Sequence, residues 1–276
     1  MKLVLEGVSG RHPAALAAAP AALRAVGLVV QSGEQVAVIG PSGAGKTTLL
    51  HLMACALRPA LGRLEIEGQD PWSLGTAPLQ RLRGRLFLAP QVPPLPPRQR
   101  VVTSVLAGRL PGMGLASSLR SLFYPVGIDL AEAALARFDL ESKLFERVDR
   151  LSGGERQRVG LARLVASNAQ LLLVDEPLSA LDPERARQAI AALCTVARER
   201  SATLVASLHH VEMALAHFPR IIGLKGGELA FDLPAAQVTP ERLHELYASH
   251  LDELTGPSTE AEFAAPPAVP VAMHCR

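Results

Sequence analysis

The chain contains the run Val36-Ala37-Val38-Ile39-Gly40-Pro41-Ser42-Gly43-Ala44-Gly45-Lys46-Thr47-Thr48, in which a short apolar segment passes directly into a glycine-rich loop. The loop matches the pattern G-x-x-x-x-G-K-[ST] and is followed by a segment predicted to be helical through Ala56. Its glycines let backbone N–H groups turn toward phosphate oxygens, and the helix N-terminus adds positive potential. Residues 40–48 are therefore predicted to bind the phosphates of a nucleotide.

The last residues of this loop carry side chains that suit a nucleotide. Lys46 can neutralise charge on the β- and γ-phosphates, the Thr47 hydroxyl can bind magnesium, and Thr48 is placed to reach the α-phosphate. The alternative is a chance glycine-rich turn, against which the position between strand and helix argues. The motif alone leaves kinases, GTPases, motors and transporters open.

Further apolar runs predict the rest of the sheet. They are Leu86–Ala89, Leu171–Val174 and Leu204–Leu208, and helical patterns separate them. Continuous apolarity indicates burial on both faces, which is typical of parallel strands covered by helices. We therefore expect an α/β fold with a mostly parallel sheet, whose ligands bind beyond the carboxyl ends of the strands.

Polar side chains follow these strands and are expected to converge there. Gln91 comes after Leu86–Ala89, Asp175 and Glu176 after Leu171–Val174, and His209 after Leu204–Leu208. Adjacent carboxylates at a strand end suit a magnesium ion and an attacking water, so we assign Asp175 to the metal and Glu176 to the water. A solvated acidic turn is the alternative for this pair.

The chain is predicted to form a single domain over residues 1–256. Residues 2–8 and 28–31 alternate loosely and predict an N-terminal antiparallel β layer. The segment at about 92–158 begins with several prolines and continues with helical stretches, so it interrupts the alternation of strands and helices. It is predicted to form an inserted α-helical subdomain. Residues 257–276 accumulate Pro, Ala, Ser and Thr without apolar periodicity, so a disordered tail is expected there.

Composition excludes several classes of protein. The hydrophobic fraction is 49%, but no stretch approaches the ~18 consecutive apolar residues of a membrane-spanning helix. The 28 basic and 26 acidic residues are distributed along the chain, so nucleic acid is not an expected partner. Cys55, Cys194 and Cys275 are far apart, which fits neither a disulfide framework nor a zinc site. The N-terminus lacks the pattern of a secretory signal, so a cytoplasmic location is expected.

A second motif narrows the function. Its residues are Leu151-Ser152-Gly153-Gly154-Glu155-Arg156-Gln157, and here the sequence resembles the ATP-binding-cassette (ABC) family, whose signature it matches throughout. The alternative is a capping box, because Ser152 and Glu155 have S-x-x-E spacing before a helical segment. Both interpretations can hold, since a capped helix N-terminus with glycines can also bind a γ-phosphate.

The resemblance implies a P-loop NTPase fold with a RecA-like sheet, and ATP and Mg²⁺ as cofactors. It also implies that the signature residues Ser152, Gly153 and Gly154 complete the ATP site of a second cassette, so this chain would pair with a copy of itself or with another cassette. Ser179-Ala180-Leu181-Asp182 is similar to the family's D-loop, which places Asp182 at the nucleotide sites.

Three more positions follow from the resemblance. Gln91 corresponds to the Q-loop glutamine that contacts magnesium and water, so it is expected to act both in catalysis and at the metal, together with Thr47 and Asp175. His209 corresponds to the switch histidine at the γ-phosphate. His12 lies where many cassettes place an adenine-stacking tyrosine.

Several stretches look like phosphonate-importer ATPases, including Ser207-Leu208-His209-His210-Val211-Glu212 and Leu243-His244-Glu245-Leu246-Tyr247. This resemblance implies ATP-driven import of a phosphonate or related oxyanion, integral-membrane permease subunits as partners, a solute-binding protein as an indirect partner, and a peripheral place on the cytoplasmic face of the membrane. A cassette of a lipid or lipoprotein exporter and a soluble ABC-type regulator remain the alternatives. Residues 92–97 are either the family's contact for the permease's coupling helix or a rigid surface loop.

Overall fold

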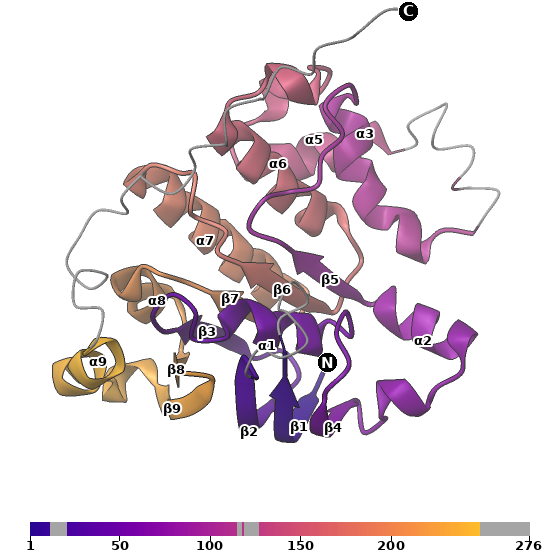
Figure 1. The fold of residues 1–276 in the computed structure, drawn as a ribbon. Coiled ribbons are helices and arrows are strands. Elements are labelled where there is room, and N and C mark those ends of the chain that lie inside the picture. The colour runs from indigo at the N-terminus through magenta and orange to yellow at the C-terminus, as the bar shows by residue number, and fades with distance from the viewer. Residues whose placement is uncertain (12–20, 115–117, 119–126, 249–276) are drawn as a thin grey trace, which may run out of the picture.

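The computed structural model describes residues 1–11, 21–114, 118 and 127–248 (Figure 1). Its larger sheet has six strands in the order β5-β6-β7-β3-β8-β9. The first five run parallel, and β9 pairs antiparallel with β8. The bounds are Leu86–Ala89 for β5, Leu171–Asp175 for β6, Thr203–Ser207 for β7, Gln35–Ile39 for β3, Arg220–Lys225 for β8 and Glu228–Pro234 for β9.

The N-terminal strands form a separate antiparallel sheet, as the sequence predicted. Its order is β2-β1-β4, with bounds Leu23–Val30, Leu3–Gly10 and Leu61–Ile66 respectively. This layer lies at the bottom of Figure 1, at the end of the molecule away from the helices α3, α5 and α6. The α/β fold with an added antiparallel layer is thus confirmed.

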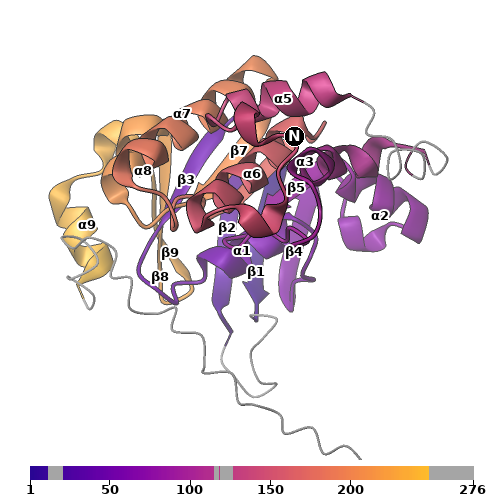
Figure 2. The same cartoon turned by 90° about the horizontal axis from the view of Figure 1, so that it is seen from above.

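Helices surround the larger sheet (Figures 1 and 2). Their bounds are Lys46–Met53 for α1, Thr76–Arg83 for α2, Val101–Leu106 for α3, Ile128–Ala136 for α5, Gly153–Ala166 for α6, Pro183–Glu199 for α7, Val211–His217 for α8 and Pro240–Tyr247 for α9. Short 3₁₀ turns cover Pro71–Ser73, Ala107–Gly112, Glu141–Lys143, Val148–Arg150 and Ala235–Gln237. Among the helices that the structure describes, none combines the length and the apolarity needed to cross a bilayer.

Strand periodicity divides the interior into two cores. Successive side chains of a strand point to opposite faces of the sheet, so Ala37 and Ile39 of β3 belong to the core shared with α6 and α7. Val36 and Val38 instead belong to the core shared with α1 and the antiparallel layer. This two-sided burial explains why β3, β6 and β7 are continuous apolar runs rather than alternating ones.

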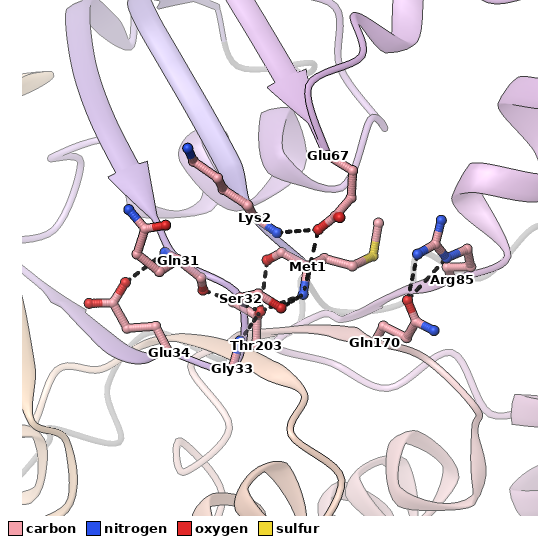
Figure 3. A network of polar contacts seen from close by, with 10 residues as sticks. All are labelled: Met1, Lys2, Gln31, Ser32, Gly33, Glu34, Glu67, Arg85, Gln170 and Thr203. Atoms are coloured by element: carbon pink, nitrogen blue, oxygen red, sulfur yellow. Dashed lines mark hydrogen bonds and ion pairs between the residues drawn. The ribbon is translucent and has the colours of Figure 1, made fainter.

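Thr203 ties the two sheets together at the amino end of β7 (Figure 3). Its fully buried hydroxyl accepts hydrogen bonds from the Gly33 N–H at 3.0 Å and the Met1 amine at 2.9 Å. The same hydroxyl donates to the Met1 carbonyl at 2.7 Å. The buried polar groups at this junction therefore satisfy one another.

Element boundaries and several elements differ from the sequence predictions. The first helix ends at Met53 rather than Ala56, because Cys55 adopts a left-handed backbone with φ of 53°. The last predicted strand begins and ends one residue earlier, at Thr203 and Ser207. Strands β4, β8 and β9 and helix α2 were not predicted. The proposed subdomain boundary at 158 falls inside α6, and the predicted tail lies outside the described residues.

Candidate nucleotide site

A cleft of about 480 Å³ lies at the carboxyl end of the larger sheet. Its walls come from five stretches of the sequence, and four of them follow strands of the larger sheet, as expected for strand ends that meet at one edge. The lining residues are Ala22, Ser42, Gly43, Ala44, Gly45, Lys46, Thr47, Thr48, Gln91, Glu176 and His209. The structure therefore brings most of the predicted loop together with Gln91, Glu176 and His209.

The glycine-rich loop needs glycine for close backbone contacts. A Cβ atom on Gly40 would lie 2.1 Å from the Leu224 carbonyl oxygen in β8, and one on Gly45 would lie 2.5 Å from the Ala22 oxygen. Gly45 also has a φ of 102°, a conformation that side chains disfavour. The loop is thus packed closely against its neighbours, and these contacts restrict its shape.

Lys46 folds back onto the loop that it follows. Its ammonium donates to the Gly40 carbonyl at 2.7 Å and to the Pro41 carbonyl at 3.3 Å. It also lies 3.9 Å from Glu176 Oε1, and its side chain is only 4% exposed. A buried ammonium held by carbonyl oxygens keeps its positive charge in the cleft, where it can meet an anion.

The turn between β8 and β9 supports the loop from outside. Gly227 donates its N–H to the Ala44 carbonyl at 3.1 Å, and its own carbonyl accepts from the Arg24 N–H at 2.8 Å. These bonds connect the phosphate-binding loop to β2 through the hairpin turn. Neither Gly227 nor Ala22 was predicted to belong to the site, because turn and loop backbone carries no chemical signal in the sequence.

Glu176 is the centre of the polar groups in the cleft. Its Oε2 accepts from Gln91 Nε2 at 2.9 Å, and its Oε1 lies 2.5 Å from His209 Nε2. Burial alone would raise the pKa of this carboxyl, but the hydrogen bond and charge of His209, together with the charge of Lys46, lower it below its usual 4.5. Glu176 is therefore ionised at neutral pH and held by three side chains.

A buried serine contacts both acidic residues at the end of β6. Ser207 Oγ donates to Asp175 Oδ1 at 2.6 Å and accepts from the Glu176 N–H at 2.9 Å. Glu176 has a φ of 45°, which is rare for a side chain other than glycine and is common at functional turns. Ser207 was not predicted as a site residue. Its signal was a hydroxyl at the carboxyl end of a strand whose three middle residues are apolar.

The signature motif begins α6 and forms the predicted capping box. Ser152 Oγ accepts from the Glu155 N–H at 3.2 Å, and Glu155 Oε2 accepts from the Ser152 N–H at 2.8 Å. A Cβ atom on Gly153 would meet open space, whereas one on Gly154 would lie 2.9 Å from the Ala180 oxygen. None of the signature residues is among those that line the cleft of this chain.

The remaining predicted positions lie elsewhere. Asp182 caps α7, because its Oδ1 accepts from the Arg185 N–H at 3.0 Å, and it forms an ion pair with the Arg185 side chain. Asp175 is 4% exposed and is not among the residues that line the cleft. His12 lies outside the described residues.

Comparisons with known proteins agree on one family. The model of the family described as "ABC transporter" matches residues 23–179. A protein named phosphonates import ATP-binding protein PhnC from Polaromonas sp. strain JS666 is 70% identical over 280 residues, covering 100% of both chains. The similarly named PhnC 2 of Albidiferax ferrireducens strain T118 is 66% identical over 277 residues, again covering 100% of both chains.

A solved structure gives the same result at lower identity. It is described as a dimeric structure of a post-hydrolysis state of the ATP-binding cassette MJ0796 bound to ADP and Pi. The TM-score is 0.73 at 28% identity, and the match covers 84% of this chain and 98% of that one.

Proposed function

The chain belongs to the ABC transporter family of ATP-binding proteins, and on this basis we propose that it energises the import of phosphonates or a related oxyanion through a separate membrane permease. As a member of this family it is an ATPase. The assignment of the cargo class rests on one observation. The chain is 70% identical, over the full length of both chains, to a protein named for phosphonate import. No described residue needs to contact the cargo for this role.

We place ATP in the cleft with its phosphates on residues 40–48. The loop's backbone N–H groups and the N-terminus of α1 favour anionic oxygens. Lys46, now bound to the carbonyls of Gly40 and Pro41, is within reach of the β- and γ-phosphates. Thr48 contacts the α-phosphate. The full set is Gly40, Pro41, Ser42, Gly43, Ala44, Gly45, Lys46, Thr47 and Thr48.

The residues near Lys46 fit a magnesium ion. Mg²⁺ prefers oxygen ligands and is commonly held by one or two carboxylates together with substrate phosphates. The Thr47 hydroxyl, the Asp175 carboxylate and the amide oxygen of Gln91, whose nitrogen bonds to Glu176, are such ligands. A bound ion would neutralise charge on the transferred phosphoryl group.

Glu176 is proposed to orient and activate the attacking water. Its lowered pKa keeps it as an acceptor, and Gln91 and His209 hold it in one orientation. His209 would then stabilise charge on the transferred phosphoryl group, together with Lys46. Ser207 fixes the backbone turn from which Glu176 projects.

Hydrolysis is proposed to require two cassettes. The signature residues Ser152, Gly153 and Gly154 do not line the cleft of their own chain, and open space lies over Gly153. They are therefore available to a γ-phosphate bound by a second copy, with Asp182 near the same junction. The dimeric ATP-binding cassette MJ0796 is similar over 84% of this chain and supports this arrangement.

The permease is proposed to dock at the proline-rich segment after Gln91. Pro93, Pro94 and Leu95 line an apolar cavity of about 180 Å³ together with Phe87 and α6, and Val92 is 68% exposed beside it. An apolar hollow next to the cleft suits an inserted helix from a membrane partner. The chain would then be peripheral on the cytoplasmic face of the membrane.

Growth on a phosphonate tests the proposal. Cells that lack this gene are complemented with the wild type, with Glu176→Gln, or with the surface control Glu212→Gln in α8. The wild type and Glu212→Gln should restore growth on an alkylphosphonate as the only phosphorus source, whereas Glu176→Gln should not. All strains should grow on inorganic phosphate.

Assays on purified proteins test the ATPase assignment separately from the cargo assignment. Glu176→Gln should retain ATP binding and lose hydrolysis by about 100-fold or more. If deletion leaves phosphonate growth unchanged while Glu176→Gln still loses hydrolysis, the cargo is wrong and the ATPase assignment stands. Recovery of the protein with a lipid or lipoprotein export permease, or with soluble partners only, would favour the exporter or the regulator.

A further inference from the structure

The C-terminal helix α9 contacts the first residue of the phosphate-binding loop. The Gly40 N–H donates to the Tyr247 hydroxyl oxygen at 3.1 Å, across 207 residues of sequence. The Tyr247 side chain is 1% exposed, so this bond is buried beneath the loop. Figure 1 shows α9 beside β8 and β9, at the β9 edge of the larger sheet.

Two further contacts fix the position of this helix relative to the loop. Lys225, the last residue of β8, donates its ammonium to the Glu245 carbonyl on α9. Leu224, its neighbour, approaches Gly40 so closely that a Cβ there would lie 2.1 Å from the Leu224 oxygen. The start of the loop is therefore packed between β8 and Tyr247, with Leu246 buried beside it.

The N–H and the carbonyl of Gly40 are held by different partners. Tyr247 binds the Gly40 N–H, and Lys46 binds the Gly40 carbonyl at 2.7 Å. Lys46 is expected to exchange its carbonyl partners for phosphate oxygens when ATP binds, whereas Tyr247 is not among the residues that line the cleft. Tyr247 is thus able to hold the loop in the same shape with and without nucleotide.

We propose that Tyr247 is a positioning residue for ATP, which pre-organises the phosphate-binding loop by accepting the buried Gly40 N–H. This inference rests on the proposed placement of ATP in the cleft. Without the hydroxyl, the N–H has no acceptor in its buried place, so the start of the free loop shifts toward water. Binding of ATP must then restore the original shape, and this requirement lowers affinity.

Tyr247→Phe tests the inference because it removes the hydroxyl and keeps the ring that packs in the core. Isothermal titration with Mg-ATP should show a Kd raised about tenfold, and the KM for ATP should rise similarly while kcat at saturation stays near the wild-type value. A residue with a purely structural role would lower the melting temperature without this split.

Thr203→Val is the matched control. It also removes a buried hydroxyl that accepts a glycine N–H, that of Gly33 at 3.0 Å, but at the opposite end of the parallel strands. This variant should melt earlier than the wild type and bind ATP normally.

Lys46→Ala distinguishes the two ways in which the idea could fail. If Lys46→Ala abolishes ATP binding but Tyr247→Phe leaves the Kd unchanged, the role of Tyr247 is overturned. If Lys46→Ala binds ATP normally, the placement of ATP itself is wrong. A Kd that rises equally in Thr203→Val and Tyr247→Phe would also overturn the inference, because it would reflect general loss of stability.

Discussion

At the scale of single residues, the cleft depends on side chains that hold one another rather than on isolated groups. Glu176 is bound by Gln91 and His209, and its backbone N–H is bound by Ser207. Such a network fixes geometry because each member has few alternative partners in the buried turn. Removing a supporting residue should therefore change catalysis as well as stability.

Ser207→Ala should reduce turnover without a matching loss of ATP affinity. The substitution leaves the Glu176 N–H without its acceptor, and a buried unsatisfied donor costs about 1–3 kcal/mol of stability. The carboxylates of Asp175 and Glu176 also lose their common support, so kcat should fall about tenfold or more. The phosphate-binding loop is untouched, and the Kd for ATP should stay close to the wild-type value. Steady-state kinetics and calorimetry measure the two quantities.

Ser104→Ala controls for the loss of a buried serine hydroxyl. Ser104 is fully buried in α3, and its hydroxyl donates to Gln99 Oε1 at 2.8 Å, outside the cleft. This variant should lose stability but keep its kcat. Equal kcat values in the two variants would show that Ser207 has no special role at the site.

At the scale of elements, the predictions that held were those based on continuous apolar runs and on closely matched motifs. The runs at Leu86–Ala89 and Leu171–Val174 became strands within one residue, because burial on both faces leaves no other place for them. Strand β4 was missed because it contains Gly62 and Arg63 and its first three residues are exposed. Strand β9 has a single buried residue and lies at the sheet edge, where no apolar run is required.

The site was predictable to a similar extent and for a similar reason. Charged and polar side chains at strand ends indicate a functional site by their residue type and position. Lys46, Gln91, Glu176 and His209 could therefore be assigned to one site from the sequence. The residues that support the phosphate-binding loop could not be assigned to the site from the sequence. Gly227 acts through its backbone, and Tyr247 is distant in sequence from the loop that it contacts.

The cap of α6 should depend on pH. Hydrogen bonds from Ser152 lower the pKa of Glu155 below its usual 4.5, so its charge stabilises the folded state above about pH 4.5. This stabilisation should be lost as pH falls through the lower pKa of the folded state. Glu155→Gln should therefore be less stable than the wild type at pH 7, and the difference should vanish at low pH. Urea unfolding at a series of pH values measures it.

Glu132→Gln provides the comparison for this pH series. Glu132 is an exposed glutamate within α5, away from the start of α6. Its stability difference from the wild type should be small and should not follow the Glu155→Gln curve. A difference for Glu155→Gln that stays constant across the series would show that the charge contributes nothing to the cap.

At the scale of the whole molecule, the phosphate-binding loop and the signature are separate parts of one chain. The signature begins α6, among helices that pack on the far side of the sheet from the antiparallel layer, and its residues do not line the cleft. In a symmetric dimer each cleft would face the signature of the other copy. Two damaged chains could then complement each other.

Mixing Lys46→Ala with Gly153→Asp should restore ATPase activity that neither variant has alone. Gly153 has open space around it, so the new carboxylate should not disturb its own chain, but it would repel a γ-phosphate bound by the partner. Each mixed dimer has one cleft with an intact loop and an intact opposing signature. A one-to-one mixture should therefore contain about a quarter of the wild-type number of intact sites.

The mixed sample needs each variant alone as its reference, at the same total protein concentration. If the signature served the cleft of its own chain, every chain in the mixture would remain damaged and activity would stay at the level of the single variants.

The supports of the phosphate-binding loop also bear on how the chain is made. They come from Ala22, Gly227 and Tyr247, so a loop translated within the first fifty residues acquires its last partner only when residue 247 has been added. A nascent chain on the ribosome therefore has the nucleotide motif long before it has the nucleotide site. A product released early, by a stop codon between the signature and α9, would carry the motif and the signature but would compete poorly for ATP and for a place in the transporter.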